Sequence, residues 1–213
     1  MNKIEKRNRT RIKICGLTRP EDIQAVNQAK PDFCGFIVEF PKSRRNVTVD
    51  QLRQLREKLD GSILPTGVFV NAPVELPAHL LNEGTIALAQ LHGQEDEAYI
   101  HQLKNMTDHL IIKAFSIKTE ADVDRAIRSE ADYILLDQGD GGTGEAFDWN
   151  LVPSIKRPWF LAGGLGCENL ETAIKLLHPW AVDLSSSVET DGRKDADKIL
   201  KAVQTVRNIK EEK

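Results

Sequence analysis

Side chains that can transfer protons or bind anions stand where short apolar runs of this 213-residue chain end. They comprise a thiol, an imidazole, two carboxylates and a pair of guanidinium groups, at Cys15, His92, Asp137, Asp183, Arg44 and Arg45. Thiols, imidazoles and carboxylates are the groups that enzymes use as general acids and bases, and a guanidinium matches the shape of a carboxylate or phosphate. The set fits acid–base chemistry if the fold brings these groups together.

A second candidate site follows the last two apolar runs of the chain. The small residues that end these runs are Gly163, Gly164, Ser185, Ser186 and Ser187. Such turns leave backbone N–H groups free to point at an anion, and a helix that begins nearby adds partial positive charge. The pattern predicts a phosphate site. Two ordinary tight turns are the alternative interpretation of these residues taken alone.

Eight short apolar runs alternate with segments of helical periodicity, and these elements must position the candidate groups. The runs span residues 11–15, 33–38, 63–70, 85–91, 110–115, 132–136, 159–162 and 180–184. Strands that are apolar throughout are buried on both faces, which is typical of parallel sheets covered by helices. We therefore predict an α/β fold, a single-domain (β/α)₈ barrel with eight parallel strands. An open doubly wound sheet is the alternative, but the first run lacks the glycine-rich turn of a dinucleotide-binding fold.

In a barrel of this kind the carboxyl ends of the strands meet on one rim, where active sites lie. Taken alone, each candidate has a simpler explanation: Cys15 is a small buried apolar residue, His92 a loop histidine and Asp137 part of an ordinary turn. Arg44 and Arg45 equally fit a solvated charged turn. Their coincidence on one rim, together with Asn71, favours a functional site.

Composition and charge exclude several classes of protein. The first 13 residues carry a net charge of +5 and the remainder −8, so a nucleic-acid-binding surface is not expected. No apolar run approaches the roughly 20 residues that span a membrane. Three cysteines without metal-type spacing indicate reduced thiols in a cytoplasm and predict no metal site. We expect residues 1–10 to form a flexible basic extension and residues 11–213 the barrel; both a monomer and a homodimer are compatible with the pattern.

Six motifs, in order along the chain, resemble phosphoribosylanthranilate isomerases. They are KICGLT at residues 13–18, FPKSRRNV at 40–47, QLHG at 90–93, LLDQ…GGTGEAFDW between 135 and 149, AGGL at 162–165 and AVDLSSSVE at 181–189. The resemblance implies a (β/α)₈ barrel of tryptophan biosynthesis. It also implies an Amadori rearrangement of N-(5-phosphoribosyl)anthranilate to the corresponding 1-deoxyribulose 5-phosphate, with no cofactor.

The resemblance further implies Cys15 as the general base and Asp137 as the general acid. A carboxylic acid kept protonated at an apolar strand end can protonate the ribose ring oxygen, and a thiolate can then take the proton from C2 of the sugar. A free thiol is only a few per cent ionised at neutral pH, so we expect a nearby positive charge or helix dipole to lower the pKa of Cys15.

The remaining roles that the resemblance implies concern the substrate. Arg45 is expected to hold the anthranilate carboxylate with its planar fork, whereas Lys42 offers only a point charge. His92 and Asp183 are expected near the anthranilate and the sugar hydroxyls. Ser187 departs from the glycine usual in the family, which leaves open how the serine loop holds phosphate.

Two other functions remain as alternatives. An isomerase of histidine biosynthesis shares the barrel and its phosphate site, but it uses paired aspartates, which Cys15 argues against. A barrel that binds a phosphosugar without catalysis is the second alternative, and the presence of both Cys15 and Asp137 argues against it.

Overall fold

The computed structural model describes residues 9–138 and 148–209, and its centre is a closed barrel of parallel strands. The eight barrel strands are β1 (Arg11–Cys15), β2 (Phe33–Val38), β4 (Leu64–Phe69), β5 (Leu88–Leu91), β6 (Leu110–Ile117), β7 (Tyr133–Gln138), β8 (Trp159–Leu161) and β9 (Ala181–Leu184). They pair in this order, and β1 closes the ring by pairing with both β2 and β9. Each strand overlaps one predicted run, so the predicted barrel is confirmed.

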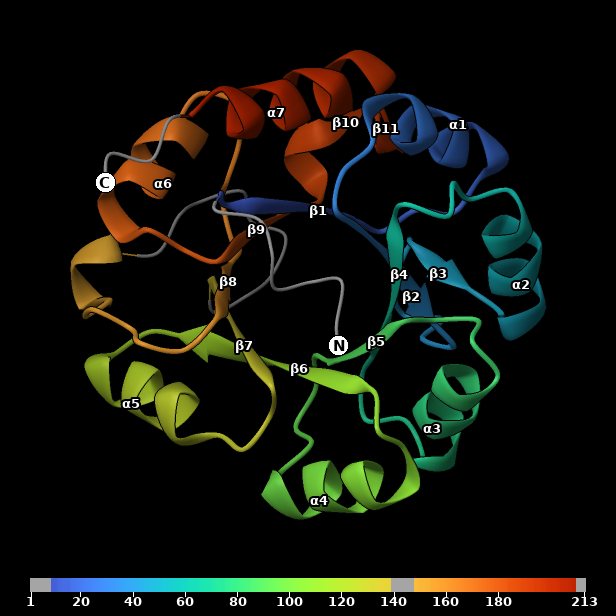
Figure 1. Ribbon diagram of the computed structural model, residues 1–213, viewed down its shortest axis with the longest axis horizontal. Helices are drawn as coiled ribbons and strands as arrows, with labels where there is room; N and C mark the ends of the chain where they lie inside the picture. The colour runs from blue at the N-terminus through green and yellow to red at the C-terminus, as the bar shows by residue number, and fades with distance from the viewer. Residues whose placement is uncertain (1–8, 139–147, 210–213) are drawn as a thin grey trace.

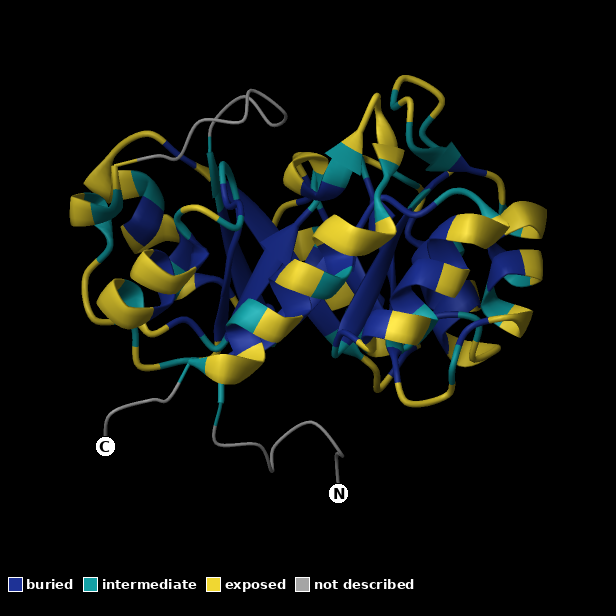
Figure 2. Cartoon of the chain, turned by 90° about the horizontal axis from the view of Figure 1, so that it is seen from above, coloured by how far each residue is buried: buried dark blue, intermediate teal, exposed yellow. Residues whose placement is uncertain are grey.

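Helices surround the barrel in a ring, as the view in Figure 1 shows. In the described part of the chain they are α1 (Pro20–Ala29), α2 (Val49–Glu57), α3 (Glu75–Asn82), α4 (Glu97–Met106), α5 (Glu120–Arg128), α6 (Leu170–Leu177) and α7 (Ala196–Asn208). A single short turn, η1 (Trp149–Leu151), is described between β7 and β8. The helices bury one face against the strands and expose the other, so that Figure 2 shows dark blue inside and yellow outside.

The strands are apolar throughout because both of their faces are buried. In β7, Ile134 and Leu136 pack toward the surrounding helices, while Leu135 between them belongs to a separate cluster in the barrel interior. In β6, Ile111 likewise packs toward the helices, and Ile112 belongs to the interior cluster. Successive side chains of a strand point to opposite faces, so a strand buried on both sides contains no polar alternation.

Aromatic side chains fill the end of the barrel where the strands begin. The ring centroids of Tyr133 and Trp180 lie 4.7 Å apart, and those of Phe33 and Phe160 lie 5.6 Å apart. The guanidinium of Arg11 lies 4.1 Å from the Trp180 ring centroid, in cation–π contact. The aromatic side chains close this end of the barrel, and the opposite end, where the strands finish, can hold a pocket.

Three short strands were not expected from the sequence. β3 (Asn46–Val47) extends the sheet beside β2, and β10 (Glu189–Thr190) pairs antiparallel with β11 (Arg193–Lys194) after the last barrel strand. Each contains only two residues, too few for any periodicity to be visible.

A capping box forms at the N-terminus of α1, one residue later than the spacing of Thr18 and Glu21 in the sequence indicates. Asp22 instead accepts hydrogen bonds from the backbone amides of Thr18 and Arg19, at 2.9 and 3.0 Å. The reason is that Pro20 occupies the first helical position, which makes Asp22 rather than Glu21 the third residue of the helix.

Some predictions lie outside the described residues. The expected basic extension does so except for Arg9 and Thr10, which contact the barrel: Arg9 Nη2 lies 2.7 Å from Asp32 Oδ1, and the Thr10 hydroxyl donates to the Pro179 carbonyl. The glycine-rich segment 139–147 is also outside them. Within the described ranges, no helix is both long and apolar enough to cross a bilayer.

Candidate active site

A pocket of about 700 Å³ opens at the carboxyl ends of the strands. Ten residues singled out from the sequence line it: Cys15, Arg45, His92, Asp137, Gly163, Gly164, Asp183, Ser185, Ser186 and Ser187. Arg44 and Asn71, also read as rim residues, do not line it. The barrel thus brings together groups that stand far apart in sequence.

Cys15 ends β1 beside a buried ion pair that the sequence analysis did not identify. Lys13, two residues earlier on the same face, is fully buried, and its Nζ lies 2.8 Å from Asp183 Oδ2. An added Cβ at Gly35 would lie 2.7 Å from Cys15 Sγ and 3.0 Å from Lys13 Nζ, so both atoms occupy the space that this glycine leaves. The signal for Lys13 was a lysine inside a strand that is buried on both faces.

The expected lowering of the Cys15 pKa is wrong in its overall direction. Burial raises the pKa of the Cys15 thiol, and the positive charge of Lys13 offsets only part of this effect. Asp183 adds to the rise, while Lys194 opposes it. The predicted cation is therefore present, but desolvation of the thiolate outweighs its effect on the pKa.

The two carboxylate oxygens of Asp183 differ in their hydrogen bonding. Burial raises its pKa, and Lys13 works against that rise by pairing with Oδ2. The other oxygen, Oδ1, is buried and has no hydrogen-bond partner within the described residues. An unpaired buried carboxylate oxygen is costly, and this atom is available to accept a further hydrogen bond.

Asp137, at the end of β7, faces an imidazole from the loop after β5. His92 Nε2 lies 3.3 Å from Asp137 Oδ2, and Gln90 Nε2 lies 2.9 Å from His92 Nδ1. When the Gln90 amide donates to Nδ1, the hydrogen of an uncharged imidazole is on Nε2, from which it can be donated to the Asp137 carboxyl group. Gln90 was missed as a separate candidate, although it is a polar residue in an apolar run.

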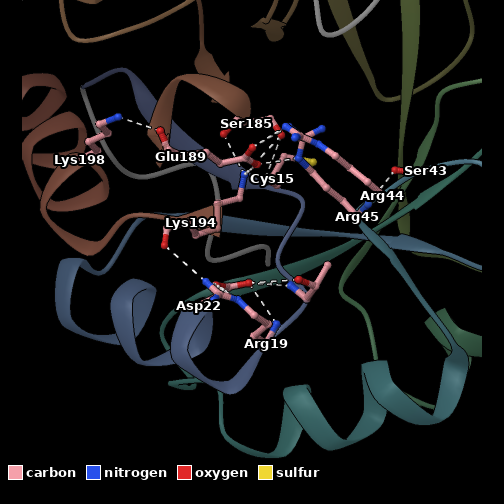
Figure 3. Close-up of polar contacts among 11 residues, drawn as sticks. Cys15, Arg19, Asp22, Ser43, Arg44, Arg45, Ser185, Glu189, Lys194 and Lys198 are labelled. Carbon is pink, nitrogen blue, oxygen red and sulfur yellow. Dashed lines mark hydrogen bonds and ion pairs between the residues drawn. The ribbon is translucent and has the colours of Figure 1, made fainter. Parts of the chain in front are cut away.

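Arg45 does not stand free in the pocket, because its guanidinium is paired with Glu189 (Figure 3). Its Nε and Nη2 donate to Glu189 Oε1 and Oε2 at 2.6 and 2.9 Å. Lys194 donates to Oε1 and Arg44 to Oε2, both at 2.7 Å. Burial opposes ionisation of Glu189, but Arg45 and Lys194 together lower its pKa to about 2.

The two candidate phosphate loops differ in how they are built. Gly163 and Gly164 have φ values of +79° and +62°, and their backbone amides donate no hydrogen bond within the described part of the chain. A Cβ at Gly163 would lie 2.5 Å from the Gln138 nitrogen and 2.8 Å from Asp137 Oδ1, so only glycine fits there. The first loop can therefore offer backbone N–H groups to an anion.

The serine loop is braced by a cation that comes from outside it. Lys194 Nζ donates to the Ser185 carbonyl at 2.8 Å, and the Ser185 hydroxyl donates to the Cys15 carbonyl at 3.1 Å. Ser186 begins the short helical turn η2 (Ser186–Val188). Lysine and arginine are absent from both loops, as the sequence indicates, yet Lys194 on β11 brings a positive charge to the second.

No group of histidine, cysteine, aspartate or glutamate among the described residues is arranged to hold a metal ion. Of the other thiols, Cys34 is buried in β2, and Cys167 is half-buried before α6. Neither lines the pocket. Cys15 is accordingly the thiol that the barrel presents to a ligand.

A parallel barrel with acid–base groups and candidate anion loops on its carboxyl rim defines a (β/α)₈-barrel enzyme. The family model described as N-(5′-phosphoribosyl)anthranilate (PRA) isomerase matches residues 12–205, and the chain belongs to this family. The N-(5′-phosphoribosyl)anthranilate isomerase of Endomicrobium trichonymphae is 42% identical over 203 residues, which are 93% of this chain and 99% of that protein.

Solved structures agree in fold and extent. The crystal structure of phosphoribosyl anthranilate isomerase from Thermotoga maritima has a TM-score of 0.85 and 33% identity, covering 94% of this chain and 100% of that one. A phosphoribosyl anthranilate isomerase in complex with reduced 1-(o-carboxyphenylamino)-1-deoxyribulose 5-phosphate has a TM-score of 0.82 and 32% identity, with the same coverage.

Proposed function

We propose that this chain converts N-(5-phosphoribosyl)anthranilate into 1-(2-carboxyphenylamino)-1-deoxy-D-ribulose 5-phosphate, an Amadori rearrangement of tryptophan biosynthesis, with Cys15 as the general base and Asp137 as the general acid. The observation that carries these roles is that the two side chains, from β1 and β7, line one pocket. Membership of the family makes the chain an aldose–ketose isomerase.

Asp137 acts in the first step. It gives a proton to the ribose ring oxygen as the bond between that oxygen and C1 breaks, and the nitrogen lone pair forms a protonated imine (iminium) between C1 and the anthranilate nitrogen. His92, at 3.3 Å, orients the carboxyl group and can stabilise the carboxylate that remains after the transfer.

Cys15 acts in the second step. Its thiolate removes the proton from C2, the electron pair forms a double bond between C1 and C2, and the imine nitrogen becomes an amine. Tautomerisation of this enol gives the ketone at C2. Because burial raises the pKa of Cys15, Lys13 is required to stabilise the thiolate.

The substrate is held at both ends. We assign the anthranilate carboxylate to Arg45 and the apolar wall of Ile37, Phe40 and Val68 to the ring. The phosphate is assigned to the backbone amides of the glycine and serine loops, and a sugar hydroxyl to Asp183 Oδ1. In this mechanism the protein needs no cofactor or metal ion. We expect it to bind neither nucleic acid nor a membrane.

The role of Cys15 requires a reduced thiol, so we propose a cytoplasmic protein, as a monomer or homodimer. The test of the function is the loss of anthranilate fluorescence when purified protein is added to N-(5-phosphoribosyl)anthranilate. We expect turnover by the wild type and its near-complete loss in Asp137→Asn, which cannot deliver the proton. A wild type without turnover, or an Asn variant with substantial kcat, would overturn the assignment.

A further inference from the structure

Glu189, the last residue of the motif AVDLSSSVE, binds three cationic side chains with one buried carboxylate. Its side chain is 5% exposed and accepts four hydrogen bonds, two from Arg45 and one each from Arg44 and Lys194. Figure 3 shows these side chains converging beside Cys15 and Ser185. The catalytic steps above make no use of Glu189.

The pairing with Glu189 uses only one edge of the Arg45 guanidinium. Nε and Nη2 point to the carboxylate, whereas Nη1 has no hydrogen-bond partner among the described residues. The end edge, formed by Nη1 and the second hydrogen of Nη2, is a further bidentate donor pair. Since Arg45 lines the pocket, Glu189 fixes the plane of the guanidinium while leaving this end edge for a second carboxylate.

Lys194 extends the same arrangement to the serine loop. Its side chain is 1% exposed, and its Nζ donates to Glu189 Oε1 and to the Ser185 carbonyl. Ser185 in turn is tied to the Cys15 carbonyl through its hydroxyl. The carboxylate of Glu189 therefore holds both the arginine and the anchor of the serine loop.

We propose that Glu189 is a positioning residue that sets the two binding ends of the pocket at once, the carboxylate end through Arg45 and the phosphate end through Lys194 and Ser185. The proposal rests on the proposed function, because it takes the two ends to bind the anthranilate carboxylate and the phosphate. Long cationic side chains lose rotamer freedom on binding, and a partner that fixes them beforehand reduces that loss.

A purely electrostatic role of Glu189 and a positioning role predict opposite changes in anion affinity when Glu189 loses its charge. Removing a negative charge from a site that binds anions strengthens the field that attracts them, and anion binding should then tighten. Removing the partner that orients Arg45 and Lys194 should instead weaken binding, because the Arg45 side chain becomes free to leave the pocket and Lys194 becomes free to leave the Ser185 carbonyl. The sign of the change in affinity decides between the two.

The experiment measures competitive inhibition by free anthranilate and by inorganic phosphate, one probe for each end, in wild type and Glu189→Gln. Glutamine keeps the size of the side chain and one acceptor oxygen but loses the charge. We expect both inhibition constants to rise by about tenfold, with a smaller change in kcat. Unchanged or tighter binding of both probes would overturn the proposal. A wild type that neither turns over substrate nor responds to the probes would overturn the proposed function with it.

Two further variants separate positioning from a general loss of stability. Lys194→Met should weaken phosphate binding by a similar factor and anthranilate binding much less, because it removes the arm toward Ser185 while Glu189 keeps both of its hydrogen bonds from Arg45. Arg44→Ala is the matched control: the Arg44 side chain is 60% exposed and lies outside the pocket lining, so neither constant should change. Equal loss of both probes in Lys194→Met would contradict the two-armed arrangement, even if Glu189→Gln failed to fold.

Discussion

Lys13 and Asp183 form a buried ion pair directly beneath the pocket, with 2.8 Å between Nζ and Oδ2. The pair joins neighbouring strands β1 and β9, and an added Cβ at Gly35 would touch both Lys13 Nζ and Cys15 Sγ. Among the charged neighbours of Cys15, Lys13 lowers the pKa of the thiol the most. Replacing Lys13 should therefore change the pH dependence of the reaction as well as the stability of the fold.

We expect Lys13→Met to move the rising limb of the pH–rate profile to higher pH by about one unit or more. Burial already raises the pKa of Cys15, and Lys13 is the main group that lowers it, so the pKa without Lys13 is higher still. The thiolate then forms only at higher pH. The titratable groups that interact with Cys15 are Lys13, Asp183, Lys194, Arg45 and Cys34, and all of them except Lys13 remain in the variant.

Lys113→Met is the matched control for that experiment. Lys113 is likewise buried and paired, with its Nζ 3.0 Å from Glu95 Oε2, but it lies in β6 away from Cys15. Breaking either buried pair should lower the free energy of unfolding by about 3–5 kcal/mol. Only Lys13→Met should shift the profile, and a shift of equal size in both variants would contradict the role of Lys13.

The stability of the protein in acid should depend on Glu189. Its folded-state pKa is about 2 against an ordinary value of 4.5, a lowered pKa, so its contribution is complete above pH 4.5 and is lost as the pH falls toward 2. That contribution is at most about 3 kcal/mol. In urea unfolding, the difference between wild type and Glu189→Gln should shrink steadily over this window. A difference that stays constant down to pH 2 would contradict the ion pairs.

Arg45 should contribute mainly to binding. Loss of a charge-assisted hydrogen bond costs about 1.5–3 kcal/mol, so Arg45→Ala should raise KM by roughly one to two powers of ten with a smaller effect on kcat. Steady-state kinetics on Arg45→Ala and Arg44→Ala check this. A larger rise in KM for Arg44→Ala would instead assign the carboxylate contact to the exposed Arg44, which would contradict the pocket geometry.

Ser187→Gly should change phosphate affinity by less than about 1 kcal/mol, because backbone N–H donors persist in both variants. The substitution restores the residue that is usual in the family. Competition by phosphate or sulfate measures the effect. A loss of 1.5–3 kcal/mol would show that the serine hydroxyl is itself a ligand, and tighter binding by the variant would show that the serine strains the turn.

The barrel could be predicted from the sequence because its strands are buried on both faces, which gives continuous apolar runs such as residues 33–38. The pocket residues could be predicted because a parallel barrel places every strand end on one rim. What the sequence does not reveal is pairing across long separations. Arg45 and Glu189 stand 144 positions apart, and nothing local indicates that they meet.

The direction in which the Cys15 pKa is shifted could not be predicted from the sequence either. A nearby cation was expected and is present as Lys13, but the balance between its charge and burial of the thiol depends on packing. The hairpin that carries Lys194 was missed because its strands, β10 and β11, have two residues each. A lysine inside an apolar strand was visible at Lys13, and that pattern merits attention in other barrels.

The assignment of the base is best tested by the kcat of Cys15→Ala, followed by loss of substrate fluorescence. General-base catalysis contributes about 10²–10⁴-fold to the rate, so we expect kcat to fall by a factor of that size. The fold should stay intact, because the substitution changes the volume of the buried side chain only slightly. Cys34→Ala, a buried cysteine outside the pocket, is the control and should keep its kcat. A wild-type kcat in Cys15→Ala would contradict the proposed mechanism.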